Sequence, residues 1–378
     1  MKLKRAIAST RTLIPRTSAL HAALRAALFA LSVLLAAAPV GAAQFSVTNL
    51  ATFSSQSSPR SINNVGQVVG HAILTSNYAN INAFLWQSGS MQDLGSLGGR
   101  DSLATAINDA GQVVGWAGTE NYGSHAFLWQ SGSMQDLGTL GGTYSVAFDI
   151  NAAGQVVGAA NTSGYAPNHA FLWQSGSMQD LGTLGGTDSA ALGINAAGQV
   201  VGQAFTSGDA TYHAFLWQSG NMQDLGTLGG KSSTALDIND TGQVVGGAGT
   251  QNYGSHAFLW QSGNMQDLGT LGGTSVARGI NAAGQVVGYS YTDVAQHAFL
   301  WQSGSMTDLN SLIDPLSGWT ITDAFDINDL GQIVASGCST GGCTAVLLTP
   351  VPEPETYLMM LAGLGLLAAK ARRRNSAQ

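Results

Sequence analysis

An internal repeat of 42 to 47 residues runs through most of this 378-residue chain and limits the folds it can adopt. One copy, from residue 125 to 158, reads HAFLWQSGSMQDLGTLGGTYSVAFDINAAGQVVG, and His169 begins the next. The glycine of a Gly-Gln pair marks the same point in seven copies, at Gly66, Gly111, Gly154, Gly198, Gly242, Gly284 and Gly331. This regular spacing indicates a repeat architecture rather than several independent domains.

Each copy contains four short segments that are typical of β-strands. In the copy above they are SVAFDIN, GQVVG, HAFLWQ and SMQDLGT, which we call strands a, b, c and d. All four are apolar and bounded by Gly, Ser or Asn, and none has helical periodicity. The a–b link is Asn-x-x-Gly, and the c–d link also contains a glycine, which adopts a positive φ without steric penalty. Each copy therefore predicts a four-stranded antiparallel meander.

The side chains of strands c and d indicate where each strand lies. Strand c alternates Phe127 and Trp129 with Ala126 and Leu128, so both of its faces are apolar and need to be covered. Burying each aromatic side chain contributes roughly 2–3 kcal/mol before entropy is subtracted. Strand d carries Asp136, and a charge is typical of an edge strand. We therefore expect strand d at an outer rim and the small-residue strand a at the centre.

The ends of the repeat region favour a closed ring. A four-stranded repeat of this length matches a β-propeller blade, with an open β-solenoid as the alternative. The repeats begin with a strand d at residues 47–52 and stop with a strand c at residues 344–348. A ring explains this split, because pairing of the two ends completes one blade. We predict an all-β fold, a seven-bladed β-propeller of four-stranded blades closed by pairing of the N-terminal and C-terminal strands.

Two segments outside the repeats indicate export. Residues 1–43 are interpreted as a signal peptide, because basic residues precede an apolar run at 26–38 and small residues at 40–43. The propeller domain is then 44–350, and a tail follows at 351–378. The tail holds Pro352-Glu353-Pro354, an apolar stretch at 357–369 and a basic cluster. Its 13 apolar residues span roughly 20 Å as a helix, less than the ~30 Å hydrocarbon layer, which predicts a marginal transmembrane anchor.

Both regions resemble known families. Pro352, Glu353, Pro354, the apolar stretch and the terminal arginines resemble a PEP-CTERM sorting signal. This resemblance implies processing by an exosortase in a Gram-negative bacterium that makes exopolysaccharide, after transient anchoring in the inner membrane. The repeats resemble the HAF extracellular repeat, on the His-Ala-Phe triplets at 125–127, 169–171, 213–215, 256–258 and 297–299; the copies at 82–84 and 344–346 depart from it. That resemblance implies a secreted or surface protein and no particular reaction.

Charge and cysteine content restrict the partners. Residues 44–350 contain four basic and 19 acidic residues, a net charge of −15. This argues against nucleic acid and anionic lipid as partners. Cys338 and Cys343 lie in GCSTGGC, and in an exported protein a disulfide is expected. A metal pair or redox motif is less consistent with this spacing, which is not Cys-x-x-Cys and has no histidine nearby.

The recurring polar residues do not predict catalysis or a metal. Five of the seven histidines precede strand c, and strand d repeats an aspartate at Asp93, Asp136, Asp180, Asp224, Asp267 and Asp308. Equivalent positions of a propeller are spread around its ring, whereas metal ligands converge within about 2.0–2.1 Å of one ion. We expect each histidine to bond within its own blade. The Leu-Gly-Gly of the d–a links, without a helix or lysine, is interpreted as a turn, and no catalytic residue, metal or cofactor is predicted.

Sequence variation concentrates in the b–c loops, which share one face of the disc with the d–a loops. The candidate ligand-binding residues there are Tyr78, Trp116, Tyr122, Tyr165, Tyr212, Tyr253 and Tyr291, although those at strand ends could equally be core. Two of the loops, at 121–124 and 252–255, both read Asn-Tyr-Gly-Ser. The repeated loop is consistent with weak multivalent binding, or with a turn that has no role in binding.

We therefore expect a non-enzymatic binding or structural protein of the extracellular polysaccharide matrix, with a glycan or another protein as its ligand. The alternatives are a hydrolase-type propeller acting on an extracellular polymer, and a structural protein without a ligand. Carboxylates converging at the mouth of the central channel would favour the hydrolase.

Overall fold

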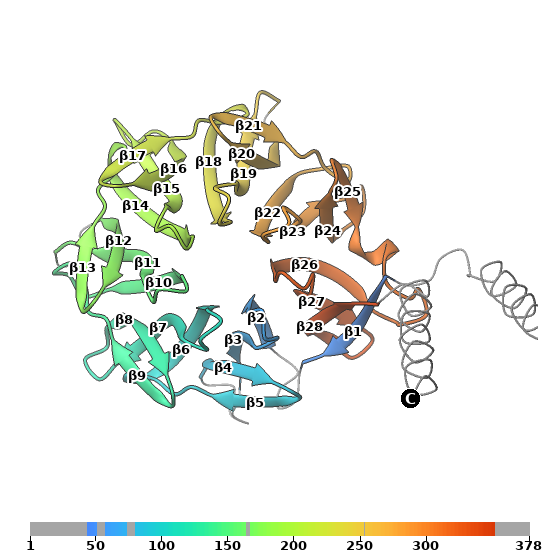
Figure 1. Cartoon of the computed structure of the whole chain (residues 1–378), viewed down its shortest axis with the longest axis horizontal. Helices are drawn as coiled ribbons and strands as arrows, with labels where there is room; N and C mark the ends of the chain where they lie inside the picture. Colours follow the sequence, from blue (N-terminus) through green and yellow to red (C-terminus); the bar gives the residue numbers. More distant parts are fainter. Residues whose placement is uncertain (1–43, 51–56, 74–79, 164–166, 253, 352–378) are drawn as a thin grey trace, which may run out of the picture. The chain divides into compact units, whose positions relative to one another are not determined.

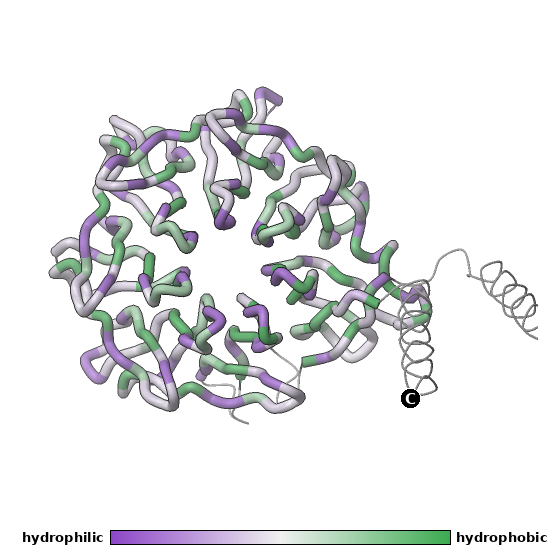
Figure 2. Tube along the Cα trace, in the orientation of Figure 1, coloured by the Kyte–Doolittle hydropathy of each residue, from purple (hydrophilic) through white to green (hydrophobic). Residues whose placement is uncertain are grey.

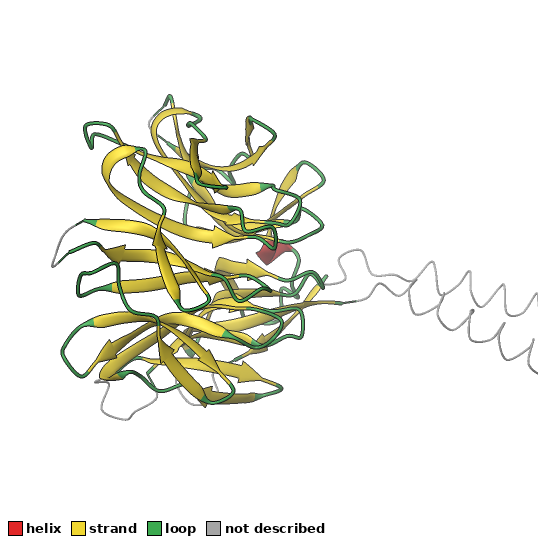
Figure 3. Ribbon diagram, turned by 60° about the vertical axis from the view of Figure 1, so that its left-hand side comes forward, coloured by secondary structure: helices red, strands yellow, loops and turns green. Residues whose placement is uncertain are grey.

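A computed structural model of the chain describes residues 44–50, 57–73, 80–163, 167–252 and 254–351. Within these ranges, 28 strands form seven four-stranded antiparallel sheets arranged radially around a central axis (Figure 1). The predicted seven-bladed propeller is confirmed. Strands dominate the described chain, and its one helix is the short 3₁₀ segment η1 (Leu309–Ser311; Figure 3).

Each of the first six blades is built from four consecutive strands, ordered in sequence from the axis to the rim. Blade 1 contains β2 (Ser57–Ile62), β3 (Val68–Ala72), β4 (Asn82–Gln87) and β5 (Ser90–Asp93). Blade 2 contains β6 (Gly98–Ile107), β7 (Val113–Thr119), β8 (Ser124–Gln130) and β9 (Ser133–Asp136). Blade 3 contains β10 (Ser145–Ile150), β11 (Val156–Asn161), β12 (Asn168–Gln174) and β13 (Ser177–Asp180).

The second half of the ring repeats this order. Blade 4 contains β14 (Gly185–Ile194), β15 (Val200–Thr206), β16 (Tyr212–Gln218) and β17 (Asn221–Asp224). Blade 5 contains β18 (Gly229–Ile238), β19 (Val244–Thr250), β20 (Ser255–Gln261) and β21 (Asn264–Asp267). Blade 6 contains β22 (Ser275–Ile280), β23 (Val286–Tyr291), β24 (Gln296–Gln302) and β25 (Ser305–Asp308).

Blade 7 joins the two ends of the domain. It combines β26 (Thr320–Ile327), β27 (Ile333–Ser339) and β28 (Gly342–Pro350) with β1 (Phe45–Asn49), which is its outermost strand. β1 runs antiparallel to β28, with Val47 opposite Leu348. The backbone N–H of Val351 also donates to the carbonyl of Gln44 at 2.8 Å. The predicted closure by N-terminal and C-terminal strands is therefore confirmed.

Two recurring glycines have separate structural causes, one in all seven repeats and the other in six, since blade 7 has Ala335 at the second position. The glycine that ends the a–b turn has a φ between 73° and 80° in all seven blades, which explains its recurrence. The glycine inside strand b is needed because strand a, which is bulged at this level, approaches the backbone of strand b too closely for a side chain. A Cβ at Gly115, for example, would overlap the backbone carbonyl of Leu103.

The core is divided among the interfaces between blades, and hydrophobic segments recur all around the ring (Figure 2). Ala126 and Leu128 of blade 2 pack with Phe171 and Trp173 of blade 3 in one cluster, and the other interfaces repeat this arrangement. The phenylalanine of strand c is fully buried, as Phe171 illustrates. Each blade thus covers one face of the next, as the two apolar faces of strand c require.

One expectation about the d–a links is wrong. In blades 2, 4 and 5 the Leu-Gly-Gly segment does not end as a turn, because its two glycines begin strand a, at Gly98, Gly185 and Gly229. In each of these blades strand b extends to a threonine that pairs with the first glycine, as Gly98 does with Thr119.

In the described part of the chain no helix is long and apolar enough to cross a membrane. The transmembrane stretch predicted at 357–369 lies outside the described residues.

Candidate functional site

The repeated histidines bond to the repeated aspartates of their own blades. The His125 Nδ1 lies 2.8 Å from Asp136, and the same pair recurs at 2.7–2.8 Å in blades 3 to 6. In blade 1, Asn82 takes the place of histidine and donates to Asp93 at 2.9 Å. These contacts fasten the start of strand c to the end of strand d. Among the described residues no cluster of His, Cys, Asp and Glu could hold a metal ion.

A closed ring of asparagines surrounds the axis at the end of strand a. The side-chain Nδ2 of each asparagine donates to the backbone carbonyl of its equivalent in the next blade, at 3.0–3.2 Å. Its Oδ1 accepts from the glutamine N–H that closes the a–b turn, as Asn195 does from Gln199. The seven members are Asn63, Asn108, Asn151, Asn195, Asn239, Asn281 and Asn328. The sequence pattern indicates only a turn at these positions.

Three aspartates that the sequence analysis did not single out lie beside this ring. Asp149 accepts from the backbone N–H of Ile150 and, across to blade 4, from Ile194, both at 2.8 Å. Asp237 and Asp326 make the equivalent bonds into blades 6 and 1. Burial raises the pKa of all three carboxyl groups, that of Asp149 to about 7. One oxygen of each carboxylate thus bonds within its own blade and the other bonds to the next blade, which is a structural role.

The predicted aromatic residues have unequal environments. Tyr122 is fully exposed and has a φ of 61°, while Tyr291 and Tyr212 are 45% and 37% exposed. Trp116 is not in a loop, because it lies in the middle of β7, partly buried beside the central channel. Tyr78, Tyr165 and Tyr253 lie outside the described residues. The structure therefore brings no continuous aromatic platform together from the residues it describes.

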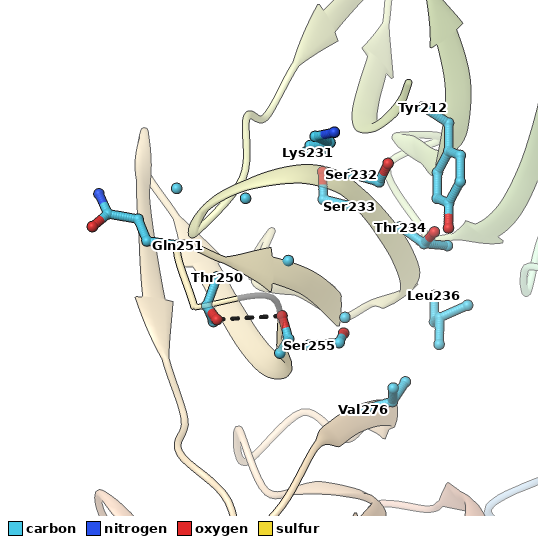
Figure 4. Close-up of a pocket in the computed structure, with 15 residues that line it drawn as sticks. Tyr212, Lys231, Ser232, Ser233, Thr234, Leu236, Thr250, Gln251, Ser255 and Val276 are labelled. Carbon is cyan, nitrogen blue, oxygen red and sulfur yellow. Dashed lines mark hydrogen bonds between the residues drawn. The ribbon is translucent and has the colours of Figure 1, made fainter. Parts of the chain in front are cut away.

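A cavity of about 660 Å³ lies instead across blade 5, on the b–c face (Figure 4). Tyr212 of blade 4 and Val276 of blade 6 stand on two sides of it. Blade 5 supplies mostly glycine backbone and polar side chains: Lys231, Ser232, Ser233, Thr234, Thr250, Gln251 and Ser255. The Thr250 hydroxyl donates to the carbonyl of Gly254 at 3.3 Å, which fixes the b–c loop at the edge of the cavity.

The blade 5 cavity exists because one side chain is missing. Strand b reads VVGWAGT in β7 of blade 2 but VVGGAGT in β19 of blade 5, so Gly247 stands where blade 2 has Trp116. A Cβ at Gly247 would lie 3.3 Å from Val276, a contact that small shifts can accommodate. Comparison of the two repeats could have found this site, because the flanking loop sequences are almost identical.

Neighbouring cavities extend this depression. One of about 380 Å³ shares Tyr212 with the blade 5 cavity, and one of about 400 Å³ shares Leu236. The walls of the blade 5 cavity offer hydroxyl, amide and backbone hydrogen-bonding groups, one ammonium group and one phenol. Such a surface can bind a polar, hydroxylated ligand by hydrogen bonds and by stacking on the tyrosine.

Cys338 and Cys343 form a disulfide that joins the ends of β27 and β28. The two residues are direct partners in the strand register, rather than loop residues. The bond therefore reinforces the hairpin whose second strand pairs with β1. It lies in the closing blade, at the end that faces the b–c loops.

Comparisons with known proteins identify the tail and the fold. The PEP-CTERM protein-sorting motif matches residues 350–374, so the chain carries this motif. No curated protein is significantly similar in sequence to this chain.

Several solved structures are similar to this chain. The β-propeller domain of the Trilobed protease from Pyrococcus furiosus, described as having an open velcro topology, has a TM-score of 0.52 at 10% identity, over 79% of this chain and 96% of that chain. YCF48 bound to D1 peptide has a TM-score of 0.49 at 13% identity, over 82% and 97%. TolB from Acinetobacter baumannii has a TM-score of 0.41 at 9% identity, over 72% and 76%. At these identities the likeness concerns the fold alone.

Proposed function

We propose that this chain is a non-enzymatic glycan-binding propeller of the extracellular polysaccharide matrix, exported and sorted to the surface of a Gram-negative cell by an exosortase-type system. The PEP-CTERM motif at 350–374 supports the sorting. The likeness of the repeats to HAF extracellular repeats is consistent with the same location. The observation that carries the binding role is the polar cavity across blade 5.

The chemistry of the blade 5 cavity suits a neutral or weakly acidic sugar. Serine, threonine and glutamine side chains can exchange hydrogen bonds with sugar hydroxyls, and the backbone of the glycine-rich wall allows close approach. Tyr212 offers the flat apolar face that stacks on the C–H side of a sugar ring. The net charge of −15 at residues 44–350 disfavours polyanions elsewhere on the surface, and Lys231 gives this cavity a local positive charge.

Filling the cavity tests the proposal. Gly247→Trp introduces the side chain that the equivalent strand of blade 2 already carries, so the backbone is suited to it. We expect retention of residues 44–351 on the producer's own exopolysaccharide to fall at least about tenfold, as loss of several hydrogen bonds would cause. Gln266→Trp, on the exposed rim of the same blade, is the matched control and should leave retention unchanged. Equal retention by both variants with an unchanged Tm would refute the blade 5 site.

The exposed tyrosine of blade 2 gives a second, separable test. Tyr122 is held at a positive φ, a conformation that costs about 1–2 kcal/mol for a residue with a Cβ. Tyr122→Gly should therefore raise the Tm slightly while it lowers glycan retention. The double substitution Tyr122→Ala with Tyr253→Ala should lower retention well beyond either single change. Wild-type retention in all of these variants would remove these tyrosines from the binding surface.

Sorting can be tested independently of binding. Replacing Pro352, Glu353 and Pro354 with alanine removes the recognition motif and leaves the apolar stretch intact. Unprocessed protein should then accumulate in the inner-membrane fraction. Mature protein of this variant outside the cell would contradict exosortase processing, whatever the glycan result.

A further inference from the structure

The cavity of about 400 Å³ on the axis of the ring has a chemistry that the proposed glycan site does not use. It lies in the half of the channel nearest the b–c loops, and the residue three positions before the ring asparagine contributes to its wall in every blade. Leu192, Leu236 and Phe148 make one side of this axial cavity apolar. Arg60 and Arg278, from blades 1 and 6, lie on the other side.

The two arginines are a large share of the positive charge of the domain. Residues 44–350 contain only four basic side chains, and the other two, Arg100 and Lys231, are exposed. Arg60 and Arg278 belong to blades at opposite ends of the sequence and meet only because the ring closes. Both guanidinium groups lie over the ring of Phe325 in blade 7, at 5.4 and 5.2 Å from its centroid.

Arg278 is already neutralised. Its Nε and Nη2 donate to the two carboxylate oxygens of Asp323 at 2.8 and 2.9 Å, in a bidentate pair. Its guanidinium also lies 5.1 Å from the centroid of Tyr289. This arginine is held in place on three sides and gives the axial cavity little net charge.

Arg60 has no carboxylate of its own among the described residues, because Asp323, which also acts on its charge, already has both oxygens paired with Arg278. Its Nε is buried and has no hydrogen-bond partner, and the same is true of the Nδ1 of His71 on the adjacent strand of blade 1. Buried polar groups without partners are rare in folded proteins, and each costs free energy until something binds it. Burial, followed by the charge of Arg60, lowers the pKa of His71 to about 4, so His71 is neutral at physiological pH.

We propose that the axial cavity binds a single carboxylate carried on an apolar body, with the carboxylate at Arg60 and the apolar body against Phe148, Leu192 and Leu236. The charges define this class. Two guanidinium groups and one carboxylate leave one uncompensated positive charge, which one anionic group neutralises. The volume is that of a site for a small molecule or a single terminal residue.

A carboxylate on an apolar body can come from a free organic acid or from the C-terminus of a peptide. The probes are therefore 3-phenylpropionate and its amide, and a pentapeptide ending in phenylalanine with a free or an amidated C-terminus. Titration calorimetry on residues 44–351 should detect saturable binding of at least one acid form. The matching amide should bind at least about tenfold more weakly, because it lacks the charge-assisted hydrogen bonds. If only the peptide binds, the carboxylate comes from a peptide C-terminus. If only 3-phenylpropionate binds, it comes from a free organic acid.

Arg60→Gln is the decisive variant, and Arg100→Gln is its matched control with the same loss of charge. Arg60→Gln should weaken binding at least about tenfold, whereas Arg100→Gln should leave it unchanged. If Arg60→Gln does not fold, Thr105→Glu replaces it: this position is the blade 2 equivalent of Arg60, and its new carboxylate would occupy the arginine. No saturable binding of either acid, equal binding of acid and amide, or equal effects of the two glutamine variants would overturn the proposal.

Discussion

The side chain of Asn328 donates a hydrogen bond to the backbone carbonyl of Asn63 at 3.0 Å, across 265 residues of sequence. This contact closes the ring of seven asparagines, in which every member bonds to the next blade. The propeller is therefore closed twice, at the rim by β1 on β28 and at the axis by Asn328 on Asn63. The inner closure does not depend on a strand taken from the other end of the chain.

The asparagine ring should be sensitive to truncation at any one member. Asn195 is buried, and Asn195→Ala removes its bond to blade 5 and leaves the turn N–H of Gln199 without a partner. We expect a loss of about 2–4 kcal/mol, seen as a lower midpoint in urea unfolding. Asn64→Ala, which removes exposed side-chain hydrogen bonds at the a–b turn of blade 1, should cost much less. Equal losses of unfolding free energy in the two variants would show that burial of the asparagine is not what makes the ring stabilising.

Removal of the outer closure should expose a strand edge. Deletion of residues 44–50 takes away β1 and leaves the backbone of β28 unpaired on one side. We expect a sharply lower Tm together with self-association, because an open apolar edge invites pairing with another chain. Thermal melts and analytical ultracentrifugation measure the two effects. A monomer with the wild-type Tm would mean that the axial ring alone holds blade 7.

Stability should rise as the pH falls from 7 to 5.5. The pKa of Asp149 is raised from 3.8 to about 7, so the folded protein binds more protons than the unfolded chain between these values. Stability therefore decreases as the pH rises through this window. Asp237 and Asp326, whose pKa values are also raised by burial, act with the same sign. His71, whose pKa is lowered to about 4, acts with the opposite sign below pH 6.5.

A single substitution isolates the contribution of the aspartate. Asp149→Asn removes the titrating group, so its Tm should change less between pH 5.5 and 7.5 than the wild-type Tm does. The variant should be less stable at both pH values, because an amide cannot accept hydrogen bonds at both positions. Parallel pH profiles for the two proteins would assign the effect to other groups.

The disulfide should stabilise the closing blade by a modest amount. The Cys338–Cys343 bond encloses a loop of only a few residues, for which chain entropy gives about 2 kcal/mol. Reduction, or Cys338→Ala with Cys343→Ala, should lower the urea midpoint accordingly while the propeller remains folded. Thiol labelling of exported, unreduced protein should find no free cysteine. Two labelled thiols would contradict the pairing.

Much of the fold could be predicted from the sequence because the repeats carry it redundantly. The glycine at positive φ, the apolar strand c and the charged strand d each recur in most copies, so an ambiguous segment is settled by its equivalents. The repeat divided between the two ends of the domain even indicated which strands close the ring. The pairing of His125 with Asp136 was only half predicted, since the histidine was assigned to its own blade and the aspartate was left without a partner.

The sites could not be predicted in the same way, because they lie where the repeats differ. The blade 5 cavity results from the absence of a side chain at Gly247, and an absence has no motif. Arg60 and Arg278 meet only through the closed ring, and neither has a neighbour in sequence that suggests a site. Nothing in the sequence sets Asp149 apart from the rest of its strand, because its acceptor role depends on the backbone of Ile194 in the next blade.

The position of β1 at the edge of blade 7 determines when the last blade can be completed. Blades 1 to 6 are contiguous in sequence, so each can form as soon as its own residues are available. β1 is synthesised first among the strands but must wait for β28, the last, before it has a partner. Completion of the disc is thus tied to arrival of the final strand, immediately ahead of the sorting motif. A chain threaded through an export channel from its N-terminus would complete the propeller only after β28 has emerged on the far side.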